Sequence, residues 1–313
     1  MTDILSSLGF SLTVTLPIFA ILLSGIYLKK ISFINDNFID VSSKLVFNVS
    51  LPLLLFFGIQ KTPLEEVSNL PLIIYAACAT FTAYILLELW AKRLEPPEDR
   101  GVFVQASFRS NMGIIGLAYC LNAYGEVGLV AASLYLGLIT ILYNVLSVIT
   151  LNHSMHGELS IVKALKGIAK NPLIIGILAG LLASTLGIPM PAVAEKTGEY
   201  FANLALPLAL LGAGGALSLN ELKTNPNKTF YASLAKLLIV PFLITAGAVI
   251  LGFRGMDLGI LFLMSSAPTA SASFIMVKAM GGNDKLAANI IAVTSLGSVV
   301  SVSLGIMIVR SFS

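Results

Sequence analysis

Apolar runs of about 20 residues follow one another along the chain, and no other feature limits its possible folds as strongly. A helix that crosses a bilayer needs about 20 apolar residues, whereas a strand of a membrane barrel needs about 10 residues that alternate in polarity. Charged residues make up 11% of the chain, against about 25% in soluble domains. The pattern predicts an all-α polytopic membrane protein embedded in the lipid bilayer.

Hydropathy divides the chain into ten predicted transmembrane helices, at residues 8–28, 38–59, 70–91, 101–123, 127–150, 168–187, 192–217, 229–252, 257–280 and 286–309. With the N-terminus outside, the inner loops hold eleven lysines and arginines and the outer loops hold four. An excess of basic residues marks the cytoplasmic side. We therefore predict a multi-pass protein of the plasma (inner) membrane with both termini outside. The first residues lack the basic start of a cleaved signal peptide, so the first helix is predicted to be retained.

The chain also repeats itself at an offset of 155 residues. The stretch "LPIFAILLSG" aligns with "NPLIIGILAG", and "NVSLPLLL" aligns with "NLALPLAL" without a gap. The second pair matches Asn48 and Pro52 with Asn203 and Pro207. Leucine matches between apolar helices are common by chance, but two asparagine–proline pairs at one offset are not.

The repeat predicts two halves of five helices each, residues 1–155 and 156–313. Because five is an odd number, the second half would enter the membrane from the opposite side. Inverted repeats of this kind are typical of secondary transporters, whose substrate site lies near the midplane where interrupted helices of the two halves meet. Glycine or proline in corresponding helices marks such interruptions.

The fourth predicted helix contains "SFRSNMGIIG", a polar cluster inside an apolar run. Arg109, Ser110 and Asn111 stand together there, and Gly113 and Gly116 follow as candidate hinge residues. Glycine weakens a helix by about 1 kcal/mol relative to alanine. The stretch is therefore predicted to be unwound or kinked and to line a cavity.

The ninth predicted helix contains the counterpart, "SSAPTASASF". An offset of 158 residues aligns Ser110 and Asn111 with Pro268 and Thr269. Proline removes a backbone donor and clashes with the preceding turn, while small hydroxyl side chains can satisfy the backbone groups that it frees. Thr269, Ser271 and Ser273 either line the cavity or let helices pack closely.

Arg109 is the most costly residue of these segments. An arginine at the middle of a membrane helix costs about 2.5–3.5 kcal/mol, and Arg109 would lie about 12 Å below the start of its helix. Its guanidinium could grip a substrate carboxylate, or it could clamp carbonyl groups of the unwound segment. Asn111, which both donates and accepts, is predicted to contact the substrate or the backbone.

Four further residues have two open interpretations each. Asn48 and Asn203 precede prolines by four residues and either satisfy the carbonyl that the proline frees or line the wall of the site. Lys236 either adds positive potential or extends toward the surface. Glu88 either pairs with Lys92 one helical turn later or carries a proton.

The predicted helices lack the residues that other functions would need. They contain no histidine, and no pair of acidic residues stands near the two polar segments. We therefore expect no enzymatic activity, no metal site and no cofactor. No ATP-binding G-x-x-x-x-G-K-[ST] motif is present, so transport would run on an existing gradient. The net charge of +3 gives no indication of a nucleic-acid partner.

These motifs resemble those of the auxin efflux carrier family, which includes plant PIN auxin transporters and bacterial malate and malonate permeases. In its fourth helix the family has Pro-Asn-Thr, then a glycine, then Tyr-Gly; here serine replaces the proline and methionine the threonine. "FNVSLPLLLF" is similar to the family's Val-Pro-Leu-Leu-Ser-Phe stretch. The other matching residues are Asn111, Gly116, Tyr124 and Gly125 in the first half and Lys236, Pro241, Arg254, Gly255, Pro268 and Lys278 in the second.

The resemblance implies that the helices form two domains with different roles. Helices at 8–59 and 168–217 would form a scaffold that also makes a homodimer, and helices at 70–150 and 229–309 would form a transport domain. Broken helices four and nine would cross at mid-membrane, and the transport domain would move by an elevator mechanism.

The sequence thus predicts a secondary active transporter of a small organic anion, a carboxylate such as malate, malonate or an auxin-like acid, with H⁺ or Na⁺ as a coupling ion. The alternative is a sodium-coupled bile-acid-type anion symporter on a related ten-helix fold, which the scarcity of buried carboxylates favours less. The predicted substrate-binding residues are Arg109, Ser110, Asn111, Pro268, Thr269, Ser271, Ser273, Asn48 and Asn203. The predicted hinge residues are Gly113, Gly116, Pro52 and Pro207, and the coupling or electrostatic residues are Lys236 and Glu88.

Overall fold

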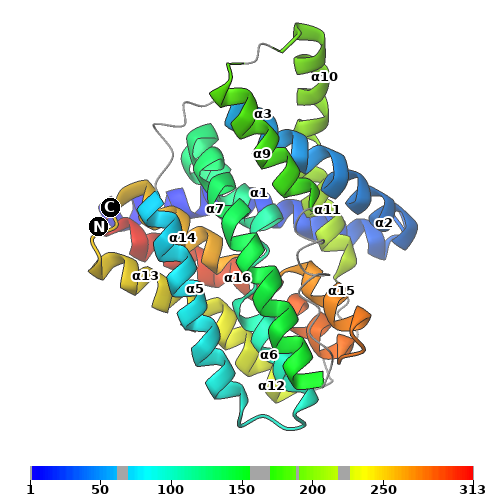
Figure 1. Cartoon of the computed structure of the whole chain (residues 1–313), viewed down its shortest axis with the longest axis vertical. Helices are drawn as coiled ribbons and strands as arrows, with labels where there is room; N and C mark the ends of the chain where they lie inside the picture. The colour runs from blue at the N-terminus through cyan, green and yellow to red at the C-terminus, as the bar shows by residue number, and fades with distance from the viewer. Residues whose placement is uncertain (1, 62–69, 156–169, 188–189, 218–225, 313) are drawn as a thin grey trace.

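The computed structural model describes residues 2–61, 70–155, 170–187, 190–217 and 226–312, which are helical apart from short connections (Figure 1). Parts of the predicted loops, at 62–69, 156–169 and 218–225, lie outside the described residues, and so do Lys163, Lys166, Lys223 and the start of the predicted sixth helix. The helices are α1 (Thr2–Lys30), α2 (Asp36–Leu45), α3 (Leu51–Lys61), α5 (Leu70–Ala91), α6 (Glu98–Phe108), α7 (Leu117–Met155), α9 (Pro172–Thr185), α10 (Ala192–Asn203), α11 (Ala205–Ala216), α12 (Pro226–Leu234), α13 (Val240–Ile250), α14 (Gly255–Ser266), α15 (Ser271–Ala279) and α16 (Asp284–Arg310).

Six helical stretches of the described chain are long and apolar enough to cross a membrane, namely Leu8–Lys30, Asp36–Lys61, Leu70–Ala91, Met112–Met155, Pro226–Ile250 and Asp284–Arg310. They confirm the prediction of an all-α polytopic membrane protein. Two further apolar helices, α9 and α14, are shorter than a full span. The predicted total of ten helices and the inversion of the halves stay predictions.

Both polar segments interrupt their helices. α6 ends at Phe108 and the chain becomes helical again at Met112, while α14 ends at Ser266 and α15 begins at Ser271. After the first break, α7 continues through the predicted boundary of helices four and five with a kink at Gly125, whose φ is +64°. Positive φ is open to glycine at little cost, and this residue makes the turn between the two predicted helices.

Three π-helical turns widen the described helices: η1 (Val46–Ser50), η2 (Met112–Gly116) and η3 (Ala235–Ile239). η1 and η3 both end two residues before a proline, Pro52 and Pro241 respectively. Proline lacks an N–H group and its ring clashes with the carbonyl four residues earlier, so a wider turn at this point relieves the clash. π turns of this kind often lie at functional sites.

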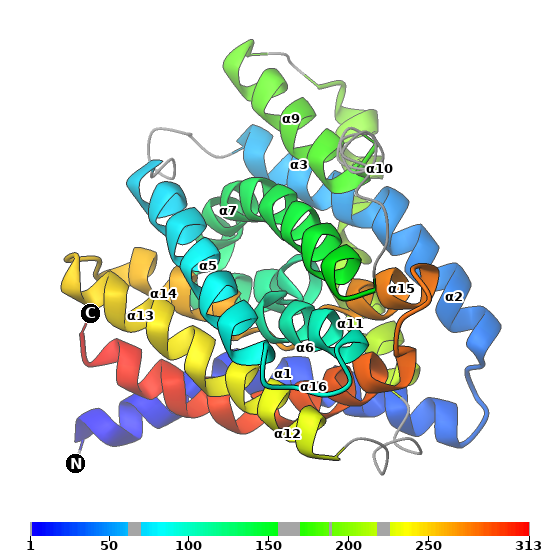
Figure 2. The same ribbon diagram turned by 60° about the horizontal axis from the view of Figure 1, so that its bottom comes forward.

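Helices α1, α2, α3, α9, α10 and α11 pack mainly against one another, with α3 on α9 and α1 on α11 (Figure 2). Glycines allow these helices to approach closely. A Cβ on Gly25 would lie 2.2 Å from the carbonyl oxygen of Leu211, and a Cβ on Gly180 would lie 2.9 Å from that of Phe56. The 155-residue offset relates Gly25 to Gly180 and Phe56 to Leu211, so the repeated residues make equivalent contacts.

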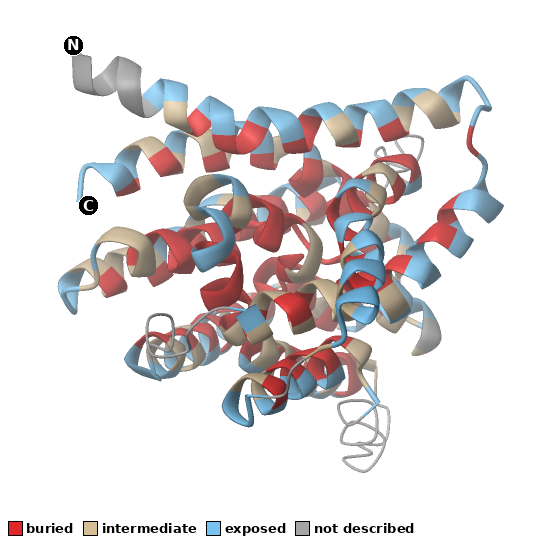
Figure 3. Ribbon diagram, turned by 90° about the horizontal axis from the view of Figure 1, so that it is seen from above, coloured by how far each residue is buried: buried red, intermediate tan, exposed pale blue. Residues whose placement is uncertain are grey.

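The remaining helices form a second group around the two breaks, and α16 lies beside α1, with the chain termini close together (Figures 1 and 2). Buried residues concentrate where the helices of this group meet, while the outward faces are exposed (Figure 3). Much of that exposed surface is apolar: Ile250 is 83% exposed and Phe242 69% exposed. Such a surface suits contact with lipid.

We expect Gly214→Ala to lower the thermal stability of the protein in detergent. A Cβ at this position would lie 2.0 Å from the carbonyl oxygen of Leu22, and a backbone atom cannot move aside as a side chain can. Overpacking of this kind costs about 1–3 kcal/mol. The matched control is Gly9→Ala in α1, where nothing lies within 4 Å of the added Cβ. Equal midpoints of thermal unfolding for the two variants would contradict the expectation.

Candidate functional site

The two breaks pair with each other through their backbones. Ser110 and Thr269 form an isolated antiparallel β-bridge. The N–H of Asn111 donates to the carbonyl of Pro268 at 2.7 Å, and the N–H of Ala270 donates to the carbonyl of Arg109 at 3.0 Å. Buried backbone groups need partners, and here the two unwound segments supply them for each other. We call residues 109–111 and 268–270 the crossover.

Two hydroxyl groups cap the helices that end at the crossover. Ser110 Oγ donates to the carbonyl of Ser265 in the last turn of α14, at 3.0 Å. Thr269 Oγ1 donates to the carbonyl of Ala106 in the last turn of α6, at 2.7 Å. The bridge partner of Ser110 is Thr269, and Ser110 Oγ donates to the carbonyl four residues before Thr269; in the same way Thr269 Oγ1 donates to the carbonyl four residues before Ser110. The crossover therefore has a local two-fold symmetry. This symmetry relates Ser110 to Thr269, so the ungapped alignment of Ser110 with Pro268 is wrong by one residue.

Arg109 directs its guanidinium group at helix α7. Nη1 donates to Ser147 Oγ at 3.0 Å, and Nη2 donates to Asn144 Oδ1 at 2.8 Å. Nη1 also lies 3.3 Å from the sulfur of Met276. The side chain is 7% exposed, and all these acceptors are neutral. Arg109 therefore ties α6 to α7, and no partner in these contacts offsets its charge.

Lys236 reaches the crossover from the π turn η3. Its ammonium group donates to the carbonyl of Ser265 at 2.8 Å and contacts Ser110 Oγ. The residue is 0% exposed. Of the two interpretations left open, extension toward the surface is therefore wrong, because the π turn and the opposing helix end hold the ammonium group inside the protein.

The crossover thus carries positive charge that no nearby acid offsets. Within the described residues, neither Arg109 nor Lys236 belongs to an ion pair; the buried ion pair of this group of helices joins Lys228 to Asp99 instead. Burying a charge without a counter-charge is costly. The geometry therefore favours an anion at the crossover.

Polar groups free to bind a ligand also lie here. The side-chain amide of Asn111 makes no hydrogen bond to the described residues and the residue is 8% exposed. Ser273 Oγ is buried and has no hydrogen-bond partner among them. Ser271 is exposed at the first residue of α15. Asn111 and Ala270 directly precede helical turns, so two helix N-termini, which favour negative charge, face this region.

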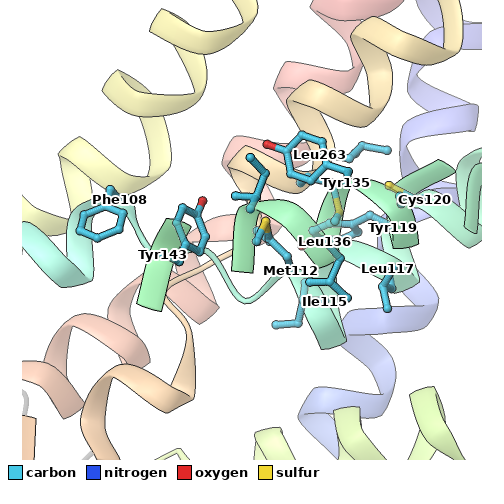
Figure 4. Close-up of a cluster of buried hydrophobic side chains, with 14 of the residues drawn as sticks. Phe108, Met112, Ile115, Leu117, Tyr119, Cys120, Tyr135, Leu136, Tyr143 and Leu263 are labelled. Carbon is cyan, nitrogen blue, oxygen red and sulfur yellow. The ribbon is translucent and has the colours of Figure 1, made fainter. Parts of the chain in front are cut away.

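Aromatic and apolar side chains pack around the unwound segment (Figure 4). The rings of Phe108 and Tyr143 meet edge to face with centroids 5.4 Å apart, and the Tyr143 hydroxyl lies 3.4 Å from Ser110 Oγ. Met112 lies on the other side of the break (Figure 4). Apolar packing on both sides lowers the local polarity and strengthens the electrostatic interactions of the site.

Sequence reasoning missed the residues of α7 that hold Arg109. Tyr143, Asn144 and Ser147 lie in the fifth predicted helix, which reads as an ordinary apolar span. The only available signal was the i, i+3 spacing of Asn144 and Ser147, which puts two polar side chains on one helix face.

Among the described residues, no hydrogen bond joins Asn48 or Asn203 to the crossover. Asn48 is exposed, and its side-chain amide donates to the backbone carbonyl of Lys44 at 2.8 Å. The carbonyl that Pro52 leaves without a helical partner is the backbone carbonyl of Asn48 itself, so the amide does not satisfy that carbonyl. The π turn η1 changes the register there. Asn203 is exposed at the last residue of α10. Pro207 lies inside α11, just after the interruption at Leu204.

The two candidate hinge glycines both lie in η2, directly after the first break. A Cβ on Gly116 would lie 2.9 Å from the sulfur of Met264 in α14, and one on Gly113 would lie 3.5 Å from Leu173 in α9. Gly116 therefore permits close approach of η2 to α14.

Glu88 lines a different place, a cavity of about 760 Å³ between α5, α6 and α7 near the start of α6. Lys92, Arg100 and His153 line the same cavity. The expected ion pair between Glu88 and Lys92 is not formed among the described residues, and Glu88 Oε1 has no hydrogen-bond partner there. The i, i+4 pair of Asp40 and Lys44, by contrast, forms at 2.7 Å.

Two interrupted helices that meet inside a helical membrane protein are typical of membrane transporters. Comparison with known proteins supports this class. A profile of the membrane transport protein family matches residues 10–306, so the chain belongs to this family, that of the auxin efflux carriers.

Three relatives span nearly the same length. A Methanothermobacter thermautotrophicus protein named "Uncharacterized transporter" is 26% identical over 92% of this chain and 95% of its own. A Rhizobium meliloti protein named "Putative malonate transporter" is 25% identical over 84% of each chain. The "Uncharacterized transporter YfdV" of Escherichia coli is 22% identical over 95% of this chain and 97% of its own. The protein is thus a transporter and not an enzyme.

Proposed function

We propose that the protein is a secondary active transporter of a small organic anion and that the crossover is its binding site. The observation that carries this proposal is the pair of buried cationic side chains, Arg109 and Lys236, with no carboxylate to offset them among the described residues. A bound carboxylate would supply the missing negative charge. Malonate is a first candidate, because one relative bears the name "Putative malonate transporter".

Different groups around the crossover would attract and orient the anion. Arg109 would attract the carboxylate and, with a small rotation, offer it two parallel N–H donors. The amide of Asn111 and the hydroxyl of Ser273 have no partner among the described residues, so they can orient the anion at no loss of existing bonds. The N-termini of η2 and α15 would add their partial positive charge.

The transport cycle we propose is an elevator-type alternating access between two five-helix halves, 1–155 and 156–313, in inverted orientation. The scaffold would comprise 8–59 and 168–217, which would also form a homodimer, and the transport domain would comprise 70–150 and 229–309. The two packing groups of helices support this division. The equivalent contacts of Gly25 and Gly180 support the repeat.

Anion flux into proteoliposomes tests the proposal. Purified protein would be given labelled malonate, malate, other small carboxylates and indole-3-acetate, with proton and sodium gradients imposed separately. We expect saturable uptake of at least one carboxylate, competed by its unlabelled form and absent from protein-free liposomes. Lack of protein-dependent flux for every anion of the panel would contradict the proposal.

A further inference from the structure

Acidic and basic side chains line the cavity of about 760 Å³ between α5, α6 and α7, three helices that pack side by side (Figure 2). Glu88 and Lys92 stand one helical turn apart on α5, but they form no ion pair in the described chain. Arg100, from α6, pairs with Glu95 at 2.8 Å. The cavity therefore holds an acid and a base that are not matched to each other, and a ligand with both a cationic and an anionic group would match them.

Two buried oxygen atoms of the cavity-lining residues lack a hydrogen-bond partner in the described chain, Glu88 Oε1 and Thr150 Oγ1. Thr150 is 1% exposed. The hydroxyl of Tyr84 engages the Glu88 carboxylate but leaves Oε1 without a partner. Buried polar atoms are rarely left unpaired. A carboxylate oxygen only accepts and a hydroxyl can accept, so this part of the cavity suits a ligand with several donors, as a primary ammonium group has.

The basic side chains of the cavity come from three helices: Lys92 from α5, Arg100 from α6 and His153 from the end of α7. Nε of Arg100 donates to the carbonyl of Leu94 at 2.8 Å and Nη2 to Glu95 at 2.8 Å. These bonds fix the guanidinium group, and its Nη1 makes no hydrogen bond to the described residues. Lys92 and His153 are exposed. Lysine and arginine are the usual phosphate-binding residues of proteins, so this part of the cavity suits a phosphate.

The cavity lies at the level of the lipid headgroups. Helix α5 is long and apolar enough to cross the membrane, and its last turns carry the lining residues, so these lie where the bilayer meets water. Trp90 stands between Glu88 and Lys92, and its ring packs on those of Phe103 and Tyr231, with centroids 5.4 and 6.2 Å apart. Tryptophan and tyrosine are enriched at this boundary.

An apolar strip continues from the cavity along α5. Ile85 and Leu89 are 41% and 52% exposed. With Glu88 and Lys92 they follow the i, i+3, i+4, i+7 spacing of a single helix face. An acyl chain that lies on this strip would bring the headgroup of its lipid to the acid and the base. A soluble ion would leave the strip unused.

We propose that this cavity binds the headgroup of one phospholipid with a primary ammonium group, such as phosphatidylethanolamine. The ammonium group would donate to the two unpartnered oxygens, the phosphate would accept from the basic side chains, and an acyl chain would lie on the apolar strip. Arg100 and Arg109 are nine residues apart along α6, about 13 Å at the helical rise. The site is thus separate from the crossover, and this inference does not rest on the proposed function.

The first measurement uses Trp90 as a reporter, because it is the single tryptophan of the chain. The purified protein in detergent is titrated with phospholipids whose acyl chains carry bromine, which quenches tryptophan fluorescence. We expect half-maximal quenching at a mole fraction of phosphatidylethanolamine at least fivefold below that of phosphatidylcholine, whose methylated ammonium has no N–H donor, or of phosphatidylglycerol, which has no amine. Equal quenching by phosphatidylcholine or phosphatidylglycerol would overturn the inference.

Soluble competitors separate a lipid site from a site for a free phosphate compound. Glycerophosphoethanolamine has the whole headgroup without acyl chains, and inorganic phosphate has the anion alone. We expect that neither, at a tenfold excess over the lipid, reverses the quenching by brominated phosphatidylethanolamine. Reversal by either compound would overturn the inference, because the cavity would then bind a soluble ion.

Two variants assign the groups of the site. Glu88→Gln should bring the affinity for phosphatidylethanolamine down to that for phosphatidylcholine, whereas Lys92→Met should weaken the binding of both lipids at least threefold. The controls are Glu126→Gln and Arg93→Met, which make the same changes of charge at exposed residues outside the cavity lining; both should bind as the wild type does. An undiminished preference for phosphatidylethanolamine in Glu88→Gln would overturn the inference. Where a variant fails to fold, as judged by size-exclusion chromatography, the comparison of lipids on the wild-type protein decides alone.

Discussion

Arg109→Ala is expected to abolish saturable anion flux in proteoliposomes while leaving a folded protein. The substitution removes a positive charge from a buried site that holds no described carboxylate. Hydrogen bonds to charged groups contribute about 1.5–3 kcal/mol each, so loss of two such bonds to a carboxylate lowers affinity by about 100-fold or more. Arg109→Lys keeps the charge without the planar pair of donors, and it should retain a small part of the flux.

Arg109 also ties α6 to α7, and this second role needs its own control. Asn144→Ala and Ser147→Ala remove the acceptors at 2.8 and 3.0 Å while they keep the guanidinium charge. We expect these two variants to retain flux within a few fold of the wild-type rate. If either variant loses as much flux as Arg109→Ala, then Arg109 acts as a clamp between helices and does not contact the substrate.

Asn111→Asp should lower anion flux without lowering the stability of the protein. The substitution hardly alters the shape of the side chain, but it places a carboxylate beside two uncompensated cations. The new charge would occupy the electrostatic place of the substrate, so we expect anion flux to fall at least 100-fold. The same charge should leave the midpoint of thermal unfolding unchanged or raise it, because a buried cation gains a partner.

The matched control for this substitution is Asn37→Asp, which adds the same charge at an exposed position of α2. It should alter neither flux nor thermal unfolding. Asn111→Ala separates charge from hydrogen bonding, and a loss of flux in Asn111→Ala equal to that in Asn111→Asp would indicate that the amide donor matters more than the repulsion. Undiminished flux in Asn111→Asp would remove the crossover from the substrate path.

Sequence reasoning located the two breaks because their causes are local. Proline, glycine and clustered polar residues weaken a helix whatever packs against it, so "SFRSNMGIIG" and "SSAPTASASF" could be recognised without a structure. The partners of Arg109 could not be found in this way. They lie on α7, more than 30 residues further along the chain, and only the tertiary fold brings them to the guanidinium group.

The errors have equally physical causes. The alignment of Ser110 with Pro268 was off by one residue because similarity of residue types does not determine the register of a β-bridge; the hydrogen bonds of Asn111 and Ala270 do. One of the two interpretations of Asn48, a bond to the carbonyl freed by Pro52, is wrong, because its amide donates to the carbonyl of Lys44. The backbone is a π turn there, in which the N–H of Leu51 donates to the carbonyl of Val46. Regular helical spacing fails wherever the helix itself changes its winding.

The absence of a described counter-charge at Arg109 and Lys236 also has an electrical consequence. If the crossover changes sides of the bilayer with both side chains protonated, an empty carrier moves two elementary charges, a carrier with a monovalent anion moves one, and a carrier with a divalent anion moves none. A membrane potential of 100 mV acts on each moved charge with about 2.3 kcal/mol. The membrane voltage would then act on the movement of the empty carrier and of the carrier with a monovalent anion, but not on that of the carrier with a divalent anion. The current recorded during exchange would therefore report the valence of the transported anion.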